Sequence, residues 1–449
     1  MTSDPVEVLR RLVRHATVSH RDPDQDDVAA FEGQHATLAE AFPLVHEHLE
    51  RTRVGRHGLL LRWPGSDPAA DPVVLMAHQD VVPVADPAAW SHPPFGGDLG
   101  PGADGEEAVW GRGTLDDKGP LVAVWAAVEA LLEQGHVPAR DVWLSSGADE
   151  EVAGTDAHEA VAELRRRGVT PWFVVDEGGA VAGGAFPGVA APLAVIGVGE
   201  KGTTRLELVA RGAGGHASTP ARGGPTARIA RAVVRLDRAS MPPRLPSPTV
   251  ELFRRLRPHA SAPLRAALRP LLADARLRPV LTRLLLAAGP ETAAMARTTV
   301  AVTTLSGSPA HNVVAATATA GLDVRVMAGD TVDDAVAHVR RTIRDDDVEV
   351  RVVEAGGPSP LSPYDDPAFA LLERTTAAIF PEAVPTPYLM MAATDARHFH
   401  AICERVYRFT PLRMSKAQRE SIHAHDEHLG TAALRAGVAW WTRLLEDLP

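Results

Sequence analysis

The chain has 449 residues, of which 45% are hydrophobic and 23% charged, and its formal net charge is −11. At this length we expect two domains, or one domain with a large insertion. The acidic balance argues against a general attraction to nucleic acid or to an anionic membrane. The single cysteine, Cys403, excludes an intrachain disulfide and a zinc cluster of thiolates.

The N-terminal stretch lacks the apolar core of a secretory signal and has the pattern of an amphipathic helix. The longest apolar candidate, residues 279–289, is too short to span a bilayer and contains Arg283. We therefore expect a cytoplasmic protein without nucleic-acid or membrane partners. The basic residues between Arg254 and Arg283 are interpreted as a solvated helical face.

Short apolar segments alternate with helical patterns through residues 1–199. Strands are predicted near residues 72–78, 141–146 and 171–176, and helices near 119–135 and 156–168. Alternation of this kind predicts an α/β domain in which helices flank a mostly parallel sheet.

The middle of the chain has a different pattern. From Thr203 apolar and polar residues alternate, as in a half-exposed strand, and further strands and amphipathic helices follow. We expect an inserted α+β domain over residues 200–355, within a larger domain formed by residues 1–199 and 356–449. The role of the helical stretch 246–290 is left open.

Acidic side chains and one histidine lie at or just beyond the carboxyl ends of three of the predicted strands. In open α/β sheets the ligand crevice lies beyond the carboxyl ends of the strands, so these side chains should meet at one edge. They are His78 and Asp80, the adjacent pair Glu150 and Glu151, and Asp176. A further pair, Asp116 and Asp117, lies in the glycine-flanked loop "WGRGTLDDKGP", where two carboxylates would repel a phosphate and attract a cation.

One histidine with several carboxylates suits Zn²⁺, Co²⁺ or Mn²⁺. Two ions would need a bridging carboxylate, which Asp116 could supply. Asp80 can hold the other ring nitrogen of His78. Of Glu150 and Glu151, one can bind metal while the other takes a proton from water. Each motif alone has a plainer interpretation as a strand end, a solvated turn or a helix cap, and their occurrence together favours the metal site.

The motifs "HQDVVP", "WGRGTLDDKGP", "DEE" and "GGHASTP" occur in the order found in a family of zinc-dependent metallopeptidases. That family includes aminoacylase, carboxypeptidase S, glutamate carboxypeptidase and dipeptidases. The resemblance covers essentially the whole chain. The long helical stretch and the endings "ATDARHF" and "IHAHDEHL" most resemble the carboxypeptidase S and N-acyl-amino-acid hydrolase branch.

The resemblance implies a role for each residue of the site. The fold would be that of a di-zinc exopeptidase, with the insertion as a lid and dimerisation domain. One metal would be held by His78 and Asp176, the other by Glu151 and His423, with Asp116 as the bridge, commonly through a cis peptide to Asp117. Glu150 would be the general base and Asp80 the residue that orients His78. His425 and His428 lie close to His423 and could be mistaken for it.

Three further residues resemble substrate-binding positions of the family: His216 and Asn312 of the lid, and Arg397, which could pair with a substrate carboxylate or form a structural salt bridge. The implied function is metal-dependent hydrolysis of an amide bond, peptide or N-acyl, in a small substrate with a free carboxylate. A dipeptidase of the same family is the alternative enzyme. A non-catalytic peptide- or amino-acid-binding relative is the alternative from another class. A homodimer through the insertion is also implied.

Overall fold

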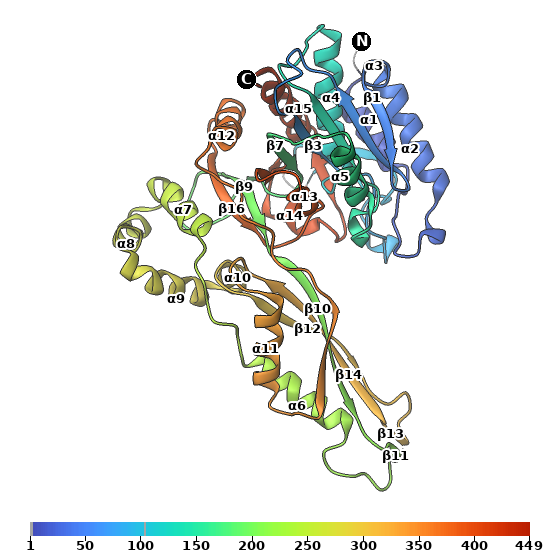
Figure 1. The fold of residues 1–449 in the computed structure, drawn as a ribbon, viewed down its shortest axis with the longest axis vertical. Coiled ribbons are helices and arrows are strands. Elements are labelled where there is room, and N and C mark those ends of the chain that lie inside the picture. The colour runs from blue at the N-terminus through green and yellow to red at the C-terminus, as the bar shows by residue number, and fades with distance from the viewer. Residues whose placement is uncertain (1–2, 103–104) are drawn as a thin grey trace.

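The computed structural model describes residues 3–102 and 105–449. It has a broad domain that contains both ends of the chain and a slender arm that projects from it (Figure 1). The chain enters the arm where β9 (Leu193–Glu200) is followed by β10 (Gly202–Arg211), and it returns after β15 (Val348–Glu354). The arm is therefore an insertion in the sequence of the broad domain.

The broad domain is built on one large sheet with the strand order β1-β2-β6-β3-β7-β17-β9-β8-β18, in which β16 also pairs with β9. The pairs β3–β6, β3–β7, β7–β17 and β9–β16 are parallel. The predicted α/β fold with a mostly parallel sheet is thus confirmed. The remaining strands of this sheet are β1 (Glu50–Val54), β2 (Gly58–Trp63), β3 (Val73–Met76), β6 (Val142–Ser146), β7 (Phe173–Asp176), β8 (Ala180–Ala182), β16 (Val384–Met390), β17 (Val406–Arg408) and β18 (Arg413–Met414).

Strand β3 shows why the central strands have continuous apolar runs in the sequence. Val73 and Leu75 pack into the hydrophobic core on one face of the sheet. Val74 and Met76 pack into a second core on the opposite face. Successive side chains of a strand point to opposite faces. In a strand that is buried on both faces every position is therefore apolar, and polar and apolar residues do not alternate.

Helices cover both faces of this sheet. The larger core includes residues of α1 (Pro5–Val13), α2 (Val28–Ala41), α3 (Pro43–His48), α4 (Lys118–Glu133), α12 (Pro367–Ile379) and α15 (Thr431–Glu446). The opposite face is covered by α5 (Asp156–Arg166) and α13 (Ala396–Phe399). A small antiparallel sheet of β4 (Asp98–Pro101), β5 (Glu107–Trp110) and β19 (His428–Gly430), the helix α14 (Lys416–Ser421) and the short 3-10 turns η1 (Pro23–Gln25), η2 (Pro87–Ala89) and η3 (Glu150–Val152) complete the domain.

The arm contains a second, antiparallel sheet with the order β12-β14-β10-β15. On β10, Leu206, Leu208 and Ala210 are buried in a separate core with residues of α6 and α11. The predicted inserted α+β unit is therefore present, although the exact division of the chain stays a prediction. Its other elements are β11 (Gly215–His216), β12 (Thr299–Ser306), β13 (Val313–Val314), β14 (Thr317–Val326), α6 (Pro225–Asp237) and α11 (Val332–Ile343).

The sequence of the arm also includes a group of helices that we call the helical insert, residues 247–294. Its helices form their own apolar cluster, which includes Val189, Leu193 and Val384 from the edge of the large sheet. The insert therefore packs beside the broad domain, as Figure 1 shows for α7, α8 and α9. No described helix is both long and apolar enough to cross a bilayer. The elements of the insert are α7 (Ser247–Leu256), η4 (Arg257–His259), α8 (Ala262–Ala273), η5 (Ala275–Leu277), α9 (Arg278–Ala288) and α10 (Pro290–Ala294).

Candidate metal centre and active site

Asp116 lies between two histidines that come from distant parts of the chain. Its Oδ1 is 2.9 Å from Nε2 of His78, and its Oδ2 is 3.0 Å from Nε2 of His423. The same nitrogen of His423 is 3.1 Å from a carboxylate oxygen of Glu151. His78 follows β3, Asp116 precedes α4, and Glu151 lies in η3. The fold thus brings these four residues together, and the peptide bond between Asp116 and Asp117 is cis.

The two carboxylates at the end of β7, Asp176 and Glu177, have different contacts, which the sequence did not indicate. The predicted ligand Asp176 accepts a hydrogen bond from the backbone N–H of Ala396, at 2.8 Å. Its neighbour Glu177 places a carboxylate oxygen 3.9 Å from Nε2 of His78. Ligand atoms of His78, Glu150 and Glu177 lie within 4.8 Å of one another. The geometry therefore favours Glu177 over Asp176 as the acid that shares a cation with His78.

Asp80 orients His78 and also anchors the turn that carries the glutamate pair. Nδ1 of His78 is 3.0 Å from the backbone carbonyl of Asp80 and 3.3 Å from its carboxylate. The same carboxylate accepts hydrogen bonds from the hydroxyl of Ser19 and from the backbone N–H groups of Glu150 and Glu151. A single buried acid thus fixes the ring of His78 and the position of the next two acids, which is the supporting role that such residues have around metals.

Glu150 is close to the centre without a direct bond to either histidine in the described structure. Its side chain lies in the cluster with His78 and Glu177. Burial, with contributions from Asp395 and Glu151, raises its pKa well above the usual value. A carboxyl that holds a proton more tightly than in water is suited to accept one and pass it on.

A buried ion pair holds the segment of His423 against the loop of Asp116. Arg112 donates to Glu427 at 2.6 Å, and both side chains are almost fully buried. The second carboxylate oxygen of Glu427 accepts the backbone N–H groups of Leu115 and Asp116. Removing one partner of such a buried pair commonly costs about 3–5 kcal/mol of stability. Sequence reasoning missed this pair, because arginine and glutamate 315 positions apart give no local signal.

The three histidines near the end of the chain have different surroundings. Only His423 among them contacts Asp116 and Glu151. His428 is buried, stacks on the ring of Trp110 at 4.2 Å and bonds to a backbone carbonyl. His425 lies edge-on to Trp90. The structure therefore places His423 at the centre, with its backbone in the left-handed region at a φ of 60°.

The donor set fits divalent cations. Carboxylates outnumber imidazoles, and burial raises the pKa of Glu177 well above the usual value, with Asp116 and Asp117 adding to the rise. Hydrogen bonds to Asp116 and Glu151 raise the pKa of His423 to about 10, so the site strongly attracts positive charge. Ligand atoms of His78, Asp116 and Glu151 also lie within 4.8 Å of one another. Imidazole nitrogens with carboxylate oxygens are a usual zinc ligand set.

The two lid residues predicted to bind substrate lie together but away from this centre. His216 is in β11, and the backbone carbonyl of Asn312, just before β13, accepts the N–H of Ala217. β11 and β13 pair with each other at the far end of the arm, remote from the broad domain (Figure 1). Both side chains are exposed. Within one chain they therefore do not complete the site.

Arg397 is in the short helix α13, directly after the loop that contains Thr394 and Asp395. Asp176 holds this helix through the N–H of Ala396, and Glu200 accepts the N–H of Thr394. Nε of Arg397 donates to the ring of His398 at 3.2 Å. Among the described residues no carboxylate forms an ion pair with Arg397, so the structural salt bridge considered from the sequence is not present there.

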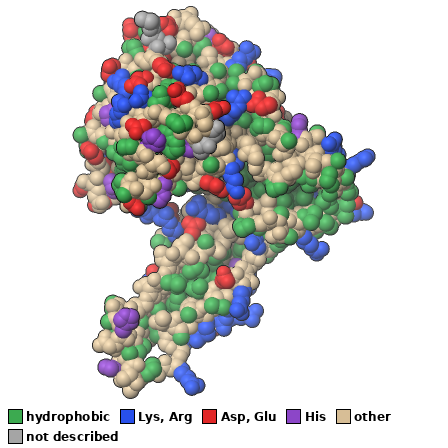
Figure 2. All heavy atoms as spheres, turned by 180° about the vertical axis from the view of Figure 1, so that it is seen from behind, with side chains coloured by type: hydrophobic (Ala, Val, Ile, Leu, Met, Phe, Trp, Pro, Cys, Tyr) green, Lys and Arg blue, Asp and Glu red, His purple; other side chains and the backbone are tan. Residues whose placement is uncertain are grey.

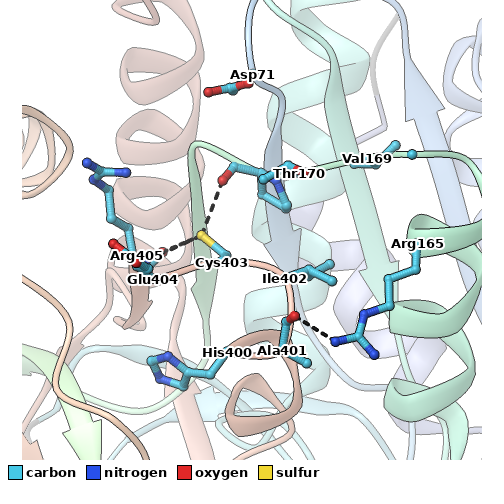
Figure 3. Close-up of a pocket in the computed structure, with 12 residues that line it drawn as sticks. Asp71, Arg165, Val169, Thr170, His400, Ala401, Ile402, Cys403, Glu404 and Arg405 are labelled. Carbon is cyan, nitrogen blue, oxygen red and sulfur yellow. Dashed lines mark hydrogen bonds between the residues drawn. The ribbon is translucent and has the colours of Figure 1, made fainter.

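A cavity of about 600 Å³ at the opposite edge of the sheet lacks comparable chemistry (Figure 3). It is lined by the segments that precede β7 and β17, and so lies at the amino ends of these strands. Sγ of Cys403 donates to the carbonyl of Pro171, and burial raises the pKa of this thiol to about 11. Burial lowers the pKa of His400 to about 4. At neutral pH neither residue carries charge, and neither is suited to act as a nucleophile or base.

Comparison with known proteins places the chain among metal-dependent peptidases. Residues 74–447 match peptidase family M20/M25/M40. The chain is 32% identical to the probable carboxypeptidase S-like 2 of Dictyostelium discoideum, over 99% of this chain and 86% of that protein. It is 33% identical to the N-fatty-acyl-amino acid synthase/hydrolase of Xenopus tropicalis, over 98% of this chain and 85% of that protein.

Solved structures share the fold. A metallo-carboxypeptidase of the M20 family from Sulfolobus solfataricus matches with a TM-score of 0.70 and 15% identity, over 100% of this chain and 99% of that one. Human carnosine dipeptidase 1 matches with a TM-score of 0.69 and 16% identity, over 99% and 95%. Together with the family match over most of its length, these findings show that the chain belongs to peptidase family M20/M25/M40.

Proposed function

We propose that this protein is a two-metal amidohydrolase that releases a carboxylic acid from an N-acyl amino acid with an apolar acyl group. The observation that carries the proposal is the position of Asp116, whose two carboxylate oxygens face His78 and His423 separately. One cation would be held by His78, Asp116 and Glu177. The other would be held by His423, Asp116 and Glu151. Zinc is the metal that this donor set suits best, and cobalt or manganese could replace it.

When bound, such ions lower the pKa of a water molecule and polarise the amide carbonyl. The residues of the chain supply the rest of the chemistry. Glu150 takes a proton from the attacking water and passes it to the leaving amine nitrogen. Asp80 fixes the ring of His78 through Nδ1, so that Nε2 faces the centre. Arg397, without a carboxylate partner among the described residues, would bind the free carboxylate of the substrate.

The preference for an apolar acyl group has support from the surface next to Asp80. A surface pocket of about 620 Å³ is lined by residues that precede and follow Asp80 in the sequence, and most of its lining side chains are apolar. Val18, which lines it, pairs with Val81 and precedes the Ser19 that bonds to Asp80. The other apolar residues that line it are Pro83, Val84, Pro87, Pro93, Pro94 and Phe95. Relatives named for N-fatty-acyl-amino acids point in the same direction.

A substrate screen tests this function. Metal-reconstituted protein is expected to hydrolyse N-acyl amino acids, with kcat/KM rising as the acyl chain lengthens, because each buried methylene contributes about 0.8 kcal/mol. Dipeptides with a free amino group are expected to be poor substrates. The readout is release of the free amino acid, with chelator-treated protein as the blank. Hydrolysis of dipeptides without hydrolysis of N-acyl amino acids would identify a dipeptidase instead, and the absence of both activities would favour a binding protein.

The choice between Glu177 and Asp176 can be tested by two matched substitutions. We expect Glu177→Gln to lower the metal content and to weaken metal binding by more than about 100-fold, because it removes a direct ligand. Asp176→Asn keeps an oxygen that can accept the N–H of Ala396, so it should retain both ions. Metal content after dialysis is the measurement. The reverse order of effects would restore Asp176 as the ligand.

The exposed position of His216 and Asn312 is explained if the arm of a second copy of the chain reaches the site. The proposal predicts a homodimer in which each centre receives these side chains from the other protomer. His216→Ala and Glu150→Gln protomers should each be almost inactive, and a mixture of the two should regain activity, since one site of the mixed dimer then has both residues intact. A monomer in sedimentation, or a dimeric mixture that stays inactive, would contradict it.

A further inference from the structure

The helical insert has a charge opposite to that of the whole chain. Its residues 247–294 contain eight arginines and three acids, Glu251, Asp274 and Glu291, which gives a formal charge of +5. The 449 residues together have a net charge of −11. Positive charge is therefore concentrated in this segment, against the balance of the molecule.

Most of these arginines have no acidic partner. Arg254 pairs with Glu251, and Arg255 pairs with Glu251 and Glu373. The other six form no ion pair with any residue that the structure describes, and all but Arg257 are exposed. They are Arg257, Arg265, Arg269, Arg276, Arg278 and Arg283. Their charges are available to an external anion.

The same helices expose apolar side chains between the arginines. On α9 the buried residues Leu281, Thr282 and Leu285 lie on one side, whereas Val280 and Leu284 on the other side are 40% and 52% exposed. On α8 only Leu268 and Leu271 are buried. The remaining exposed positions of α8, apart from its arginines, are alanine or proline, without a polar or acidic side chain.

The surface that results is visible from behind the molecule. In Figure 2 the projection that corresponds to the helical insert carries a broad field of apolar atoms with basic side chains at its edges. A helix face exposed to water normally carries charged residues of both signs. An apolar face bordered by arginines is instead the pattern of a helix that lies in the interface of a membrane.

We propose that α8 and α9 dock the protein on the surface of an anionic lipid bilayer. Val280 and Leu284 enter the interface, and the unpaired arginines contact the headgroup phosphates. A symmetric contact with a second copy would bring arginines against arginines, so the charge of the face favours lipid over self-association. The expectation of no membrane partner rested on the net charge, which averages over this segment, and on the lack of a spanning run, which a surface contact does not require.

Docking there would bring the centre close to amphiphilic substrates, a consequence that rests on the proposed function. Helix α7 packs against β16, and β16 ends at Met390, shortly before the loop that leads to Arg397. The helical insert and the candidate substrate loop therefore share one strand as their support. The docking itself does not depend on the chemistry of the site.

Vesicle flotation with the full chain tests the proposal. We expect the protein to float with phosphatidylcholine vesicles that contain phosphatidylglycerol, to remain behind with phosphatidylcholine alone, and to be released by high salt. The double variant Val280→Glu, Leu284→Glu and the double variant Arg276→Glu, Arg278→Glu should each reduce the bound fraction by about tenfold or more. The control is Val137→Glu, which adds a charge at a 58% exposed valine outside the insert and should bind like the unmodified chain. Circular dichroism and metal content establish that each variant is folded.

Three results would overturn the proposal. One is the absence of flotation of the unmodified chain with anionic vesicles. Another is equal binding by the charge-reversal variants and the control, which would place any lipid contact elsewhere. The third is a dimer in sedimentation that Val280→Glu, Leu284→Glu dissociates, without vesicle binding by the unmodified chain, since the face would then be occupied by a second copy. Hydrolysis of a soluble N-acyl amino acid, measured in parallel, separates a failure of this proposal from a failure of the proposed chemistry.

Discussion

Replacement of Glu150 by glutamine is expected to lower kcat about 10²–10⁴-fold while both metal ions stay bound. Glutamine keeps the shape of the side chain but cannot take a proton from water. The side chain of Glu150 lies beside His78 and Glu177 in the cluster. The metal ligands proposed here do not include it, so its loss should change turnover without changing metal content.

The comparison needs two measurements on the same preparation. Metal content should be equal in the Glu150→Gln variant and the unmodified protein, and KM should change far less than kcat. A matched control is Glu159→Gln, which makes the same change at an exposed position of α5. Near-normal kcat in Glu150→Gln would refute its role as the base. Loss of metal in that variant would reassign Glu150 as a ligand.

Replacement of Asp116 by asparagine is expected to release both metal ions and to abolish hydrolysis. Among the residues that the structure describes, only Asp116 contacts both His78 and His423, through separate oxygens. Asparagine offers one neutral oxygen and an amide nitrogen that cannot bind a cation. Metal affinity should fall by more than 100-fold, about the largest effect of replacing a residue that only supports a metal ligand.

Metal titration followed by calorimetry or by competition with a chelator measures this effect. Glu177→Gln should weaken one of the two sites more than the other, whereas Asp116→Asn should weaken both. Asp67→Asn, the same change in an exposed turn, serves as the control and should bind metal normally. Retention of two ions by Asp116→Asn would show that the carboxylate does not bridge them.

The parts of the site that the sequence predicted are those fixed by strand ends. His78 and Asp80 follow a strand with an unambiguous apolar pattern, so their place at the carboxyl edge of the sheet follows from the fold. The same reasoning could not separate Asp176 from Glu177. Neighbouring residues at a strand end point in different directions, and which one faces the centre depends on where the strand stops. In the structure β7 ends at Asp176, and the carboxylate of this residue accepts a hydrogen bond from the backbone N–H of Ala396 in α13.

Contacts between residues far apart in the sequence decide most of the site assignments that sequence patterns could not make. The choice among His423, His425 and His428 depends on Trp90, Trp110 and the bond between Arg112 and Glu427, none of which is local. His216 resembles a substrate-binding residue, yet the length of the arm keeps it far from the centre of its own chain (Figure 1). A resemblance in sequence identifies such a residue but does not show whether it completes the site of its own subunit or that of another.

The helical insert shows the limit of reasoning from overall charge. The net charge of −11 describes the chain as a whole, but contacts with a surface depend on the charge that faces it. Screening restricts the influence of distant acids to about 10 Å at ordinary ionic strength. The unpaired arginines of α8 and α9 therefore act almost independently of the acidic broad domain.

The central claim is that two cations share Asp116, and anomalous diffraction from crystals of the zinc-reconstituted protein tests it most directly. Two anomalous peaks are expected, one between His78 and Glu177 and one between His423 and Glu151, with Asp116 in contact with both. The absence of ordered metal at these residues, or a single ion that leaves Asp116 without contact, would contradict it.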